Sequence, residues 1–291
     1  MTKKLSPFHL LIYVVLILIW GSSFILMKKG LLVFTSAQVA AIRITTACLV
    51  LLPFLLFRLK EVEKKKVFYM LLMGLTGSGI PAFLFTEAET QVSSSLAGIL
   101  NALTPLFVLM LGILFFKMKF TSLKVIGILV GFAGSAMLIV FNSEGGGASN
   151  IYYAAMIVVA TVLYGLSNNI IMRYLQGCNP ILMTAVAMAF MGPFVFAWLM
   201  TTDFTQRLHV DGALYSLSSC MILGAFGTSI ALVIYNYLIQ TTGALFGSTV
   251  TYFMPLVAIA WGFADGEPIG AMDFVALLII LFGIYLVRRS K

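Results

Sequence analysis

The feature of this sequence that most constrains its fold is a succession of apolar runs, each about as long as a membrane is thick. A helix needs about 20 predominantly apolar residues to cross the hydrocarbon core. The stretch 67–116 is too long for one span, so we divide it at its polar cluster, Glu87–Gln91. The sequence therefore predicts an all-α membrane protein with ten transmembrane helices. The expected spans are residues 8–27, 37–57, 67–88, 93–116, 125–141, 151–172, 181–200, 213–238, 246–264 and 272–287.

The composition supports the same class. Of the 291 residues, 61% are apolar and only 10% are charged, whereas an ordinary soluble domain is about 45–50% apolar and about 25% charged. A soluble protein of this size has no interior large enough to bury so much apolar surface. We therefore exclude a soluble enzyme, a secreted disulfide-bonded scaffold and a disordered chain.

The basic residues predict the orientation of the spans, because Lys and Arg are enriched in cytoplasmic loops. With ten spans and a cytoplasmic N-terminus, the C-terminus is also cytoplasmic, and 14 of the 18 basic residues lie on the inner side. This bias explains the net charge of +8, so we expect membrane lipids as partners and no nucleic acid. The expected location is the inner membrane. The 14 residues are Lys3, Lys4, Arg58, Lys60, Lys64, Lys65, Lys66, Lys117, Lys119, Lys124, Arg173, Arg288, Arg289 and Lys291.

The sequence also contains an internal repeat of five spans. Four pairs of patterns recur in the same order, at offsets between 140 and 150 residues. Since five is odd, the second half enters from the opposite side, so we expect two inverted five-helix repeats, residues 1–145 and 146–291. Such inverted repeats are typical of secondary transporters, whose substrate site lies near the midplane between the halves. The pairs are Trp20-Gly21 with Tyr164-Gly165, Pro53-Phe54 with Pro193-Phe194, Pro105-Leu106 with Pro255-Leu256, and Gly134 with Gly283.

Several motifs carry a family resemblance. The first span contains Trp20-Gly21-Ser22-Ser23-Phe24, the second has Arg43 near its start, and the fourth contains Asn101-Ala102-Leu103-Thr104-Pro105-Leu106. Gly266-Glu267-Pro268 precedes the last span. Over essentially its whole length, the chain resembles the ten-span EamA-type branch of the drug/metabolite transporter superfamily. The resemblance implies a transporter of small metabolites, often amino acids and commonly in the export direction. The chain departs from the family pattern at Lys117, where the first repeat usually has a Gly-Glu pair.

Polar and aromatic side chains inside the spans are the candidates for a substrate cavity. Polar groups are costly in lipid and tend to face the bundle interior or a watery cavity. Amides and phenols there suit neutral or zwitterionic substrates, which they hold by hydrogen bonds. The alternative for each residue is helix packing, with the side chain satisfying backbone groups. The candidates are Trp20, Ser22, Ser23, Asn101, Tyr164, Asn168, Asn169, Tyr235, Asn236, Thr251 and Tyr252.

Two prolines mark expected helix pivots. Pro105 cannot donate to the carbonyl of Asn101, one turn earlier, which frees an acceptor beside an amide side chain in mid-membrane. Thr251 stands in the same relation to Pro255. We expect the fourth and ninth spans to meet the cavity as symmetry partners, with simple helix packing as the alternative.

Arg43 is the only basic residue clearly inside a span, about six residues and therefore about 9 Å from its outer end. We expect a carboxylate partner at similar depth, and Glu87 and Glu89 at the outer end of the third span are the candidates. Such a pair either ties two helices together or forms a gate, with Arg43 able to clamp a substrate carboxylate. Glu87 or Glu89 is also the only candidate proton carrier, since no acidic residue is expected at the midplane.

Glycines at spacings of four predict close helix packing. Gly127-x-x-x-Gly131 and Gly243-x-x-x-Gly247 both fit the pattern of small residues that lets two helices approach each other. We expect each pair to face a neighbouring helix.

The functional hypothesis is a secondary transporter that moves a small polar metabolite, an amino acid or a related compound, across the inner membrane by alternating access. Export is the expected direction, and no oligomer is required. The sequence contains no His-Glu-x-x-His, Gly-x-Ser-x-Gly or phosphate-loop motif, so we expect no enzyme, no metal site and no cofactor. A channel, a membrane scaffold or sensor, and a flippase of lipid-linked metabolites are the alternatives.

Overall fold

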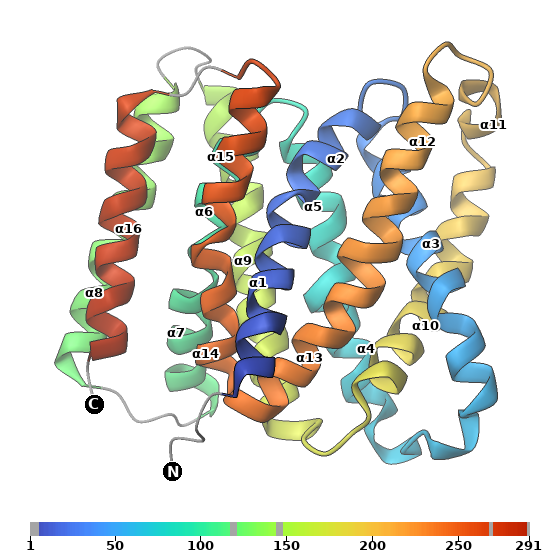
Figure 1. Ribbon diagram of the computed structural model, residues 1–291, viewed down its shortest axis with the longest axis horizontal. Helices are drawn as coiled ribbons and strands as arrows, with labels where there is room; N and C mark the ends of the chain where they lie inside the picture. The colour runs from blue at the N-terminus through green and yellow to red at the C-terminus, as the bar shows by residue number, and fades with distance from the viewer. Residues whose placement is uncertain (1–5, 117–120, 144–147, 268–269, 290–291) are drawn as a thin grey trace.

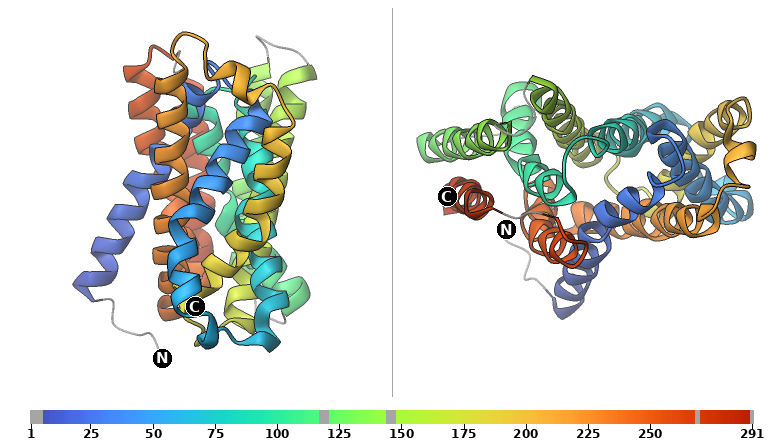
Figure 2. Two further views of the ribbon diagram at one scale, coloured as in Figure 1. Left: turned by 90° about the vertical axis from the view of Figure 1, so that its right-hand side faces the viewer. Right: turned by 90° about the horizontal axis from the view of Figure 1, so that it is seen from above.

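Helices make up all the regular structure in the described part of the chain. The computed structural model describes residues 6–116, 121–143, 148–267 and 270–289, and these ranges contain no strand. The helices stand side by side in a bundle that is elongated when seen along the helix axes (Figures 1 and 2). In chain order they are α1 (Pro7–Gly21), α2 (Ser23–Gly30), α3 (Ser36–Phe57), η1 (Leu59–Glu61), η2 (Lys64–Lys66), α4 (Val67–Gly74), η3 (Leu75–Gly79), α5 (Ile80–Ala88), α6 (Ser94–Asn101), α7 (Thr104–Phe116), α8 (Ser122–Ser143), α9 (Ala148–Tyr174), α10 (Pro180–Met200), α11 (Phe204–Arg207), α12 (Ala213–Ile222), η4 (Leu223–Ile230), α13 (Ala231–Thr242), α14 (Ala244–Ser248), η5 (Thr249–Tyr252), α15 (Met254–Ala264) and α16 (Ala271–Arg289).

Eight stretches of the described chain are helical, long and apolar enough to cross a membrane. They correspond to the expected spans one to four and six to nine, and the division of 67–116 is confirmed because α5 ends at Ala88 and α6 begins at Ser94. The expected fifth and tenth spans lie in α8 and α16, where the apolar stretches Val125–Gly134 and Phe274–Gly283 are shorter. A total of ten transmembrane helices therefore stays a prediction.

The two ends of the bundle can be told apart by the chain termini. The start of α1 and the end of α16 lie at the same end, the lower one in Figure 1, as an even number of crossings requires. We call this the near end, and we call the opposite end, where α2 ends and α3 begins, the far end. Which end faces the cytoplasm stays a prediction.

The outside of the bundle is strongly apolar. Phe57, Leu214 and Phe263 are 89%, 80% and 79% exposed. Soluble proteins rarely expose apolar surface on this scale, and lipid is the solvent in which it is stable. The periphery of the fold is therefore suited to a bilayer.

Five of the expected spans are interrupted. The first breaks at Ser22 between α1 and α2, and the fourth breaks at residues 102–103 between α6 and α7. In the ninth, the 3-10 segment η5 separates α14 from α15, while η3 and η4 are π-helical insertions in the third and eighth. Pro105 and Pro255 are the second residues of α7 and α15, a position where proline costs no hydrogen bond. Each proline thus starts a new helix rather than kinking a continuous one, and a pivot role stays a prediction.

Two equivalent glycine contacts relate the halves. A Cβ on Gly21 would lie 2.5 Å from Cβ of Val257, and a Cβ on Gly165 would lie 3.0 Å from Cβ of Phe107. Gly21 and Gly165 are 144 positions apart, and Phe107 and Val257 are 150 apart. The first span thus meets the ninth as the sixth meets the fourth. The boundary between the repeats at residues 145 and 146 stays a prediction.

The two glycine pairs named from their spacing behave differently. A Cβ on Gly283 of α16 would lie 2.6 Å from backbone atoms of both Gly127 and Gly131, so α8 and α16 pack at close range. Gly243 instead has a φ of +99° and open space where a Cβ would lie. It provides the turn between α13 and α14, because only glycine adopts such a φ without strain. The prediction that Gly243 packs against a neighbouring helix is wrong.

Candidate functional site

A cavity of about 80 Å³ lies among the interrupted spans, with room for several water molecules. Among the described residues, the lining comes from the expected spans one to four and six to nine. Substrate binding by these residues stays a prediction. Of the residues singled out from the sequence, the lining contains Trp20, Ser23, Arg43, Asn101, Tyr164, Asn168, Tyr235, Asn236 and Thr251.

Trp20, Tyr235 and Asn168 form one connected group on the cavity wall. Nε1 of Trp20 donates to the carbonyl of Gly227 over 2.8 Å, which holds the indole against η4. The Tyr235 ring meets the indole edge to face, with centroids 4.7 Å apart. Nδ2 of Asn168 donates to the Tyr235 hydroxyl over 2.8 Å. One side chain each from the first, sixth and eighth spans therefore sets the shape of this wall.

At the break in the fourth span, the free carbonyl is bound by Thr104, which the sequence analysis named only as part of a motif. Oγ1 of Thr104 donates over 2.9 Å to the carbonyl of Asn101, the acceptor that Pro105 leaves free. Nδ2 of Asn101 lies 3.7 Å from Sδ of Met254. The amide therefore faces the break in the ninth span, and the two broken spans meet at the cavity.

Asn236 connects the eighth span to the seventh. Its Nδ2 donates to Oγ1 of Thr184 over 2.9 Å, and both residues line the cavity. A buried amide needs a hydrogen-bond partner, and Thr184 of the seventh span provides it for Asn236 at the cavity wall.

Three candidates do not line the cavity: Ser22, Asn169 and Tyr252. Nδ2 of Asn169 donates to the carbonyls of Val108 and Gly165, over 2.9 and 2.8 Å, so this amide serves helix packing. Oγ of Ser22 accepts a hydrogen bond of 2.8 Å from an indole of α15. Successive helical residues point about 100° apart, so Ser23 reaches the cavity while Ser22 does not, and Asn168 reaches it while Asn169 does not.

Arg43 does not form the expected ion pair. Its side chain is buried, Nε donates to Oγ1 of Thr228 over 2.6 Å, and the guanidinium lies 3.8 Å from Sδ of Met27. Neither Glu87 nor Glu89 comes within ion-pair distance among the described residues. The reason is depth: Arg43 is seven residues, about 10 Å, below the start of α3, whereas Glu89 lies beyond the end of α5.

The two glutamates border a second pocket, at the far end. Glu87 accepts a hydrogen bond from the hydroxyl of Ser36, which joins the end of α5 to the start of α3. Glu89 is only 8% exposed, and neither of its carboxylate oxygens has a hydrogen-bond partner among the described residues. The carboxylate of Glu87 is thus hydrogen-bonded, whereas that of Glu89, two residues later, is buried without a hydrogen bond to any described residue.

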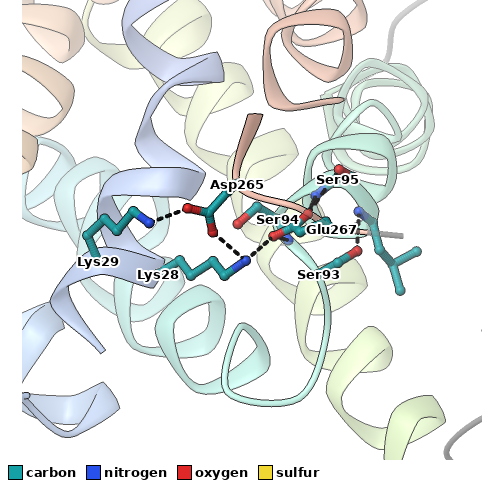
Figure 3. Close-up of polar contacts among 8 residues, drawn as sticks. Lys28, Lys29, Ser93, Ser94, Ser95, Asp265 and Glu267 are labelled. Carbon is teal, nitrogen blue, oxygen red and sulfur yellow. Dashed lines mark hydrogen bonds and ion pairs between the residues drawn. The ribbon is translucent and has the colours of Figure 1, made fainter. Parts of the chain in front are cut away.

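The far end also holds a group that we call the far-end charge cluster, made of Lys28, Lys29, Asp265 and Glu267 (Figure 3). Nζ of Lys28 lies 2.9 Å from Glu267 and 2.7 Å from Asp265, which also pairs with Lys29. Burial opposes ionisation of Glu267, but the hydrogen bond and charge of Lys28 hold its pKa below the usual value. Hydrogen bonds from both lysines lower the pKa of Asp265. The cluster joins the first span to the loop after the ninth.

Glu267 also caps a helix. It accepts from the backbone N–H groups of Ser94 and Ser95, both over 3.3 Å, and from the Ser95 hydroxyl over 3.1 Å (Figure 3). A carboxylate is favoured there because the first N–H groups of a helix have no partner inside it. Glu267 was noted in the sequence only as part of a motif, since its partners are more than 170 residues away.

A repeat signal that would have located the π-helical segments was also missed. Residues 74–80 read GLTGSGI and residues 224–230 read GAFGTSI, at an offset of 150. Serines 144 positions apart pack on them in equivalent ways: a Cβ on Gly77 would meet Oγ of Ser167, and one on Gly227 would meet Oγ of Ser23. Both segments border the cavity, and π-helical insertions are frequent at functional sites.

Comparisons with known proteins agree with this architecture. The sequence model of the EamA-like transporter family matches twice, over residues 8–140 and 151–289. The chain is 29% identical over 279 residues to the uncharacterized inner membrane transporter YedA of Escherichia coli K12, covering 95% of this chain and 89% of that one. It is 27% identical over 275 residues to an uncharacterized transporter of Archaeoglobus fulgidus, covering 94% and 95%. A crystal structure of 16% sequence identity matches with a TM-score of 0.67 over 97% of this chain and 96% of that chain, which shows the fold alone.

Proposed function

The chain belongs to the EamA-like transporter family, and on that premise we propose that it exports a small polar metabolite bearing a carboxylate, an amino acid or a related compound. The inner membrane is its location, in keeping with the relative from Escherichia coli that is named as an inner membrane transporter. In this proposal the ten spans form two inverted five-helix repeats, and both termini are cytoplasmic. The far end then faces outward.

The observation that carries the proposal is the environment of Arg43. A guanidinium has five N–H donors, yet among the described residues only a threonine hydroxyl and a thioether accept from it. No aspartate or glutamate is among the described residues of the cavity lining. The cavity therefore has one fixed positive charge with unused donors, and the bidentate fit of guanidinium to carboxylate favours a carboxylate ligand. Organic cations are disfavoured for the same reason.

The broken spans supply the remaining parts of the mechanism. Interrupted helices near the midplane expose backbone groups to a substrate, as in other secondary transporters with inverted repeats. Trp20, Tyr235 and Asn168 provide an aromatic wall with a hydroxyl and an amide. Rocking of the two halves about the breaks before Pro105 and Pro255 would expose this site to each side in turn.

Counterflow in proteoliposomes tests the proposal. Vesicles loaded with unlabelled protein amino acids are placed in a radiolabelled mixture of the same amino acids, and saturable uptake of label is the expected result. Arg43→Gln should lower this uptake at least about tenfold, because a hydrogen bond to a charged group contributes about 1.5–3 kcal/mol. Arg58→Gln is the matched control, since Arg58 is half exposed at the near end and pairs with Glu61.

Three results would contradict the proposal. Label uptake that rises linearly with concentration would indicate a channel. The absence of counterflow for every amino acid and for simple monocarboxylates would exclude this substrate class. Equal loss of uptake in Arg43→Gln and Arg58→Gln would remove the special role of Arg43.

A further inference from the structure

Glu89 is a buried acid that nothing in the proposed transport cycle uses so far. Its side chain is 8% exposed, and both oxygens lack a hydrogen-bond partner among the described residues. Glu87, two residues earlier, borders the same pocket but is hydrogen-bonded to Ser36. An ionised carboxylate that is buried without a partner is strongly unfavourable, and such a group takes up a proton instead.

Three charged residues face Glu89 from elements packed around it: Lys28 from α2, Arg43 from α3 and Glu267 from the loop after α15. Lys28 is engaged by Glu267 and Asp265 in the far-end charge cluster, and Arg43 is bound to Thr228. Neither cation therefore forms an ion pair with Glu89. Burial first, and then the negative charge of Glu267, raise the pKa of Glu89 well above its usual value.

Resting on the proposed function, we propose that Glu89 is the proton-binding site of this transporter and that one proton moves with each substrate carboxylate. The step is a simple exchange: the carboxylate of Glu89 takes one proton from water while it is buried, and returns that proton to water on the outer side when the far end opens. No bond other than the O–H bond forms or breaks.

The sign of the coupling follows from Arg43. Its positive charge lowers the proton affinity of Glu89. A substrate carboxylate bound to the guanidinium neutralises that charge, so the proton affinity of Glu89 rises when substrate is bound. By linkage, a protonated Glu89 also strengthens substrate binding by the same factor. Substrate and proton therefore bind together and cross together, so export down the substrate gradient carries one proton outward with each carboxylate.

An infrared pH titration of the detergent-solubilised full-length chain tests the proton site without any substrate. A protonated carboxylic acid has a carbonyl band that is separate from the bands of carboxylates. Wild type and Glu87→Gln should keep this band at about pH 7, well above the ordinary glutamate pKa of about 4.3, whereas Glu89→Gln should lose it. A band that persists in Glu89→Gln, or that disappears equally in Glu87→Gln, would overturn the assignment.

The coupling is tested in proteoliposomes with the same radiolabelled amino-acid mixture. With the membrane potential held at zero, a gradient of one pH unit should drive about tenfold accumulation at one proton per substrate. Glu89→Gln should reduce this accumulation to none while counterflow continues, because its amide mimics the protonated acid. Glu87→Gln should accumulate label like wild type. If counterflow is present but wild type does not respond to the gradient, the coupling fails while the proposed function stands; if counterflow is absent, the proposed function fails.

Discussion

Glu267→Gln should destabilise the protein by an amount that the structure allows to be worked out. The Glu267 side chain is only 5% exposed, and its carboxylate pairs with Lys28 over 2.9 Å. It also accepts two backbone N–H groups and one hydroxyl at the start of α6. Glutamine keeps the shape and one acceptor oxygen, but it removes the charge and presents an NH₂ group to these donors.

A hydrogen bond to a charged group contributes about 1.5–3 kcal/mol, against about 1 kcal/mol for a neutral one. Lys28 is partly exposed, at 36%, so its attraction to the carboxylate is weakened by solvent. We therefore expect the free energy of unfolding to fall by about 2–3 kcal/mol in Glu267→Gln. The matched control is Glu61→Gln, because Arg58 and Glu61 form a pair that is half exposed and such pairs contribute less than about 1 kcal/mol.

The assay is denaturant unfolding of both variants and wild type in the same detergent, repeated as a function of pH. Because the pKa of Glu267 is lowered in the folded state, its stabilisation is present above the unfolded pKa of about 4.3 and is lost as the pH falls through the folded pKa. The difference between wild type and Glu267→Gln should therefore shrink in acid. Equal stability at neutral pH, or a difference that does not change below about pH 4, would refute this account of the cluster.

Three further predictions concern the cavity and its helix breaks. Gly165→Ala should lower the unfolding free energy by about 1–3 kcal/mol, because the new Cβ would lie 2.9–3.0 Å from backbone and Cβ atoms of α7; an unchanged unfolding curve would argue against this packing. Thr104→Val should cost about 1–2 kcal/mol in the same measurement, whereas Thr201→Val, which loses a similar but exposed bond, should cost less than about 0.5 kcal/mol. Tyr235→Phe keeps the ring against Trp20 but leaves the Asn168 amide without its acceptor. It should raise the half-saturation concentration for counterflow by about threefold to tenfold, and an unchanged value would separate this hydroxyl from substrate binding.

The helix positions were predictable because hydropathy is a local property. The division between α5 and α6 follows from the polar cluster at the end of α5, and a single glycine with positive φ separates α13 from α14. The interruptions within spans were less visible. Pro105 and Pro255 indicated the breaks in the fourth and ninth spans. The π-helical segments were indicated only by the match between residues 74–80 and 224–230, which appears when the two halves of the sequence are compared.

The side-chain partners were far less predictable. The sequence paired Arg43 with Glu87 or Glu89, while the structure places it against Thr228, 185 positions away. Charge alone names possible partners, but depth in the bundle and the direction of each helix face select among them. The capping of α6 by Glu267 likewise depends on two loops that meet only after the helices have packed.

The sequence by itself determined that the chain crosses a bilayer in helices and that its two halves are related. Both follow from local rules, since every backbone group in lipid must be satisfied within its own helix and repeated segments keep their patterns. Only the tertiary structure decided that Asn168 lines the cavity while Asn169 binds backbone carbonyls, and that the buried Glu89 has no hydrogen-bond partner in the described part of the chain. Adjacent helical residues point in different directions, so the packing of neighbouring helices alone settles which of them faces the cavity.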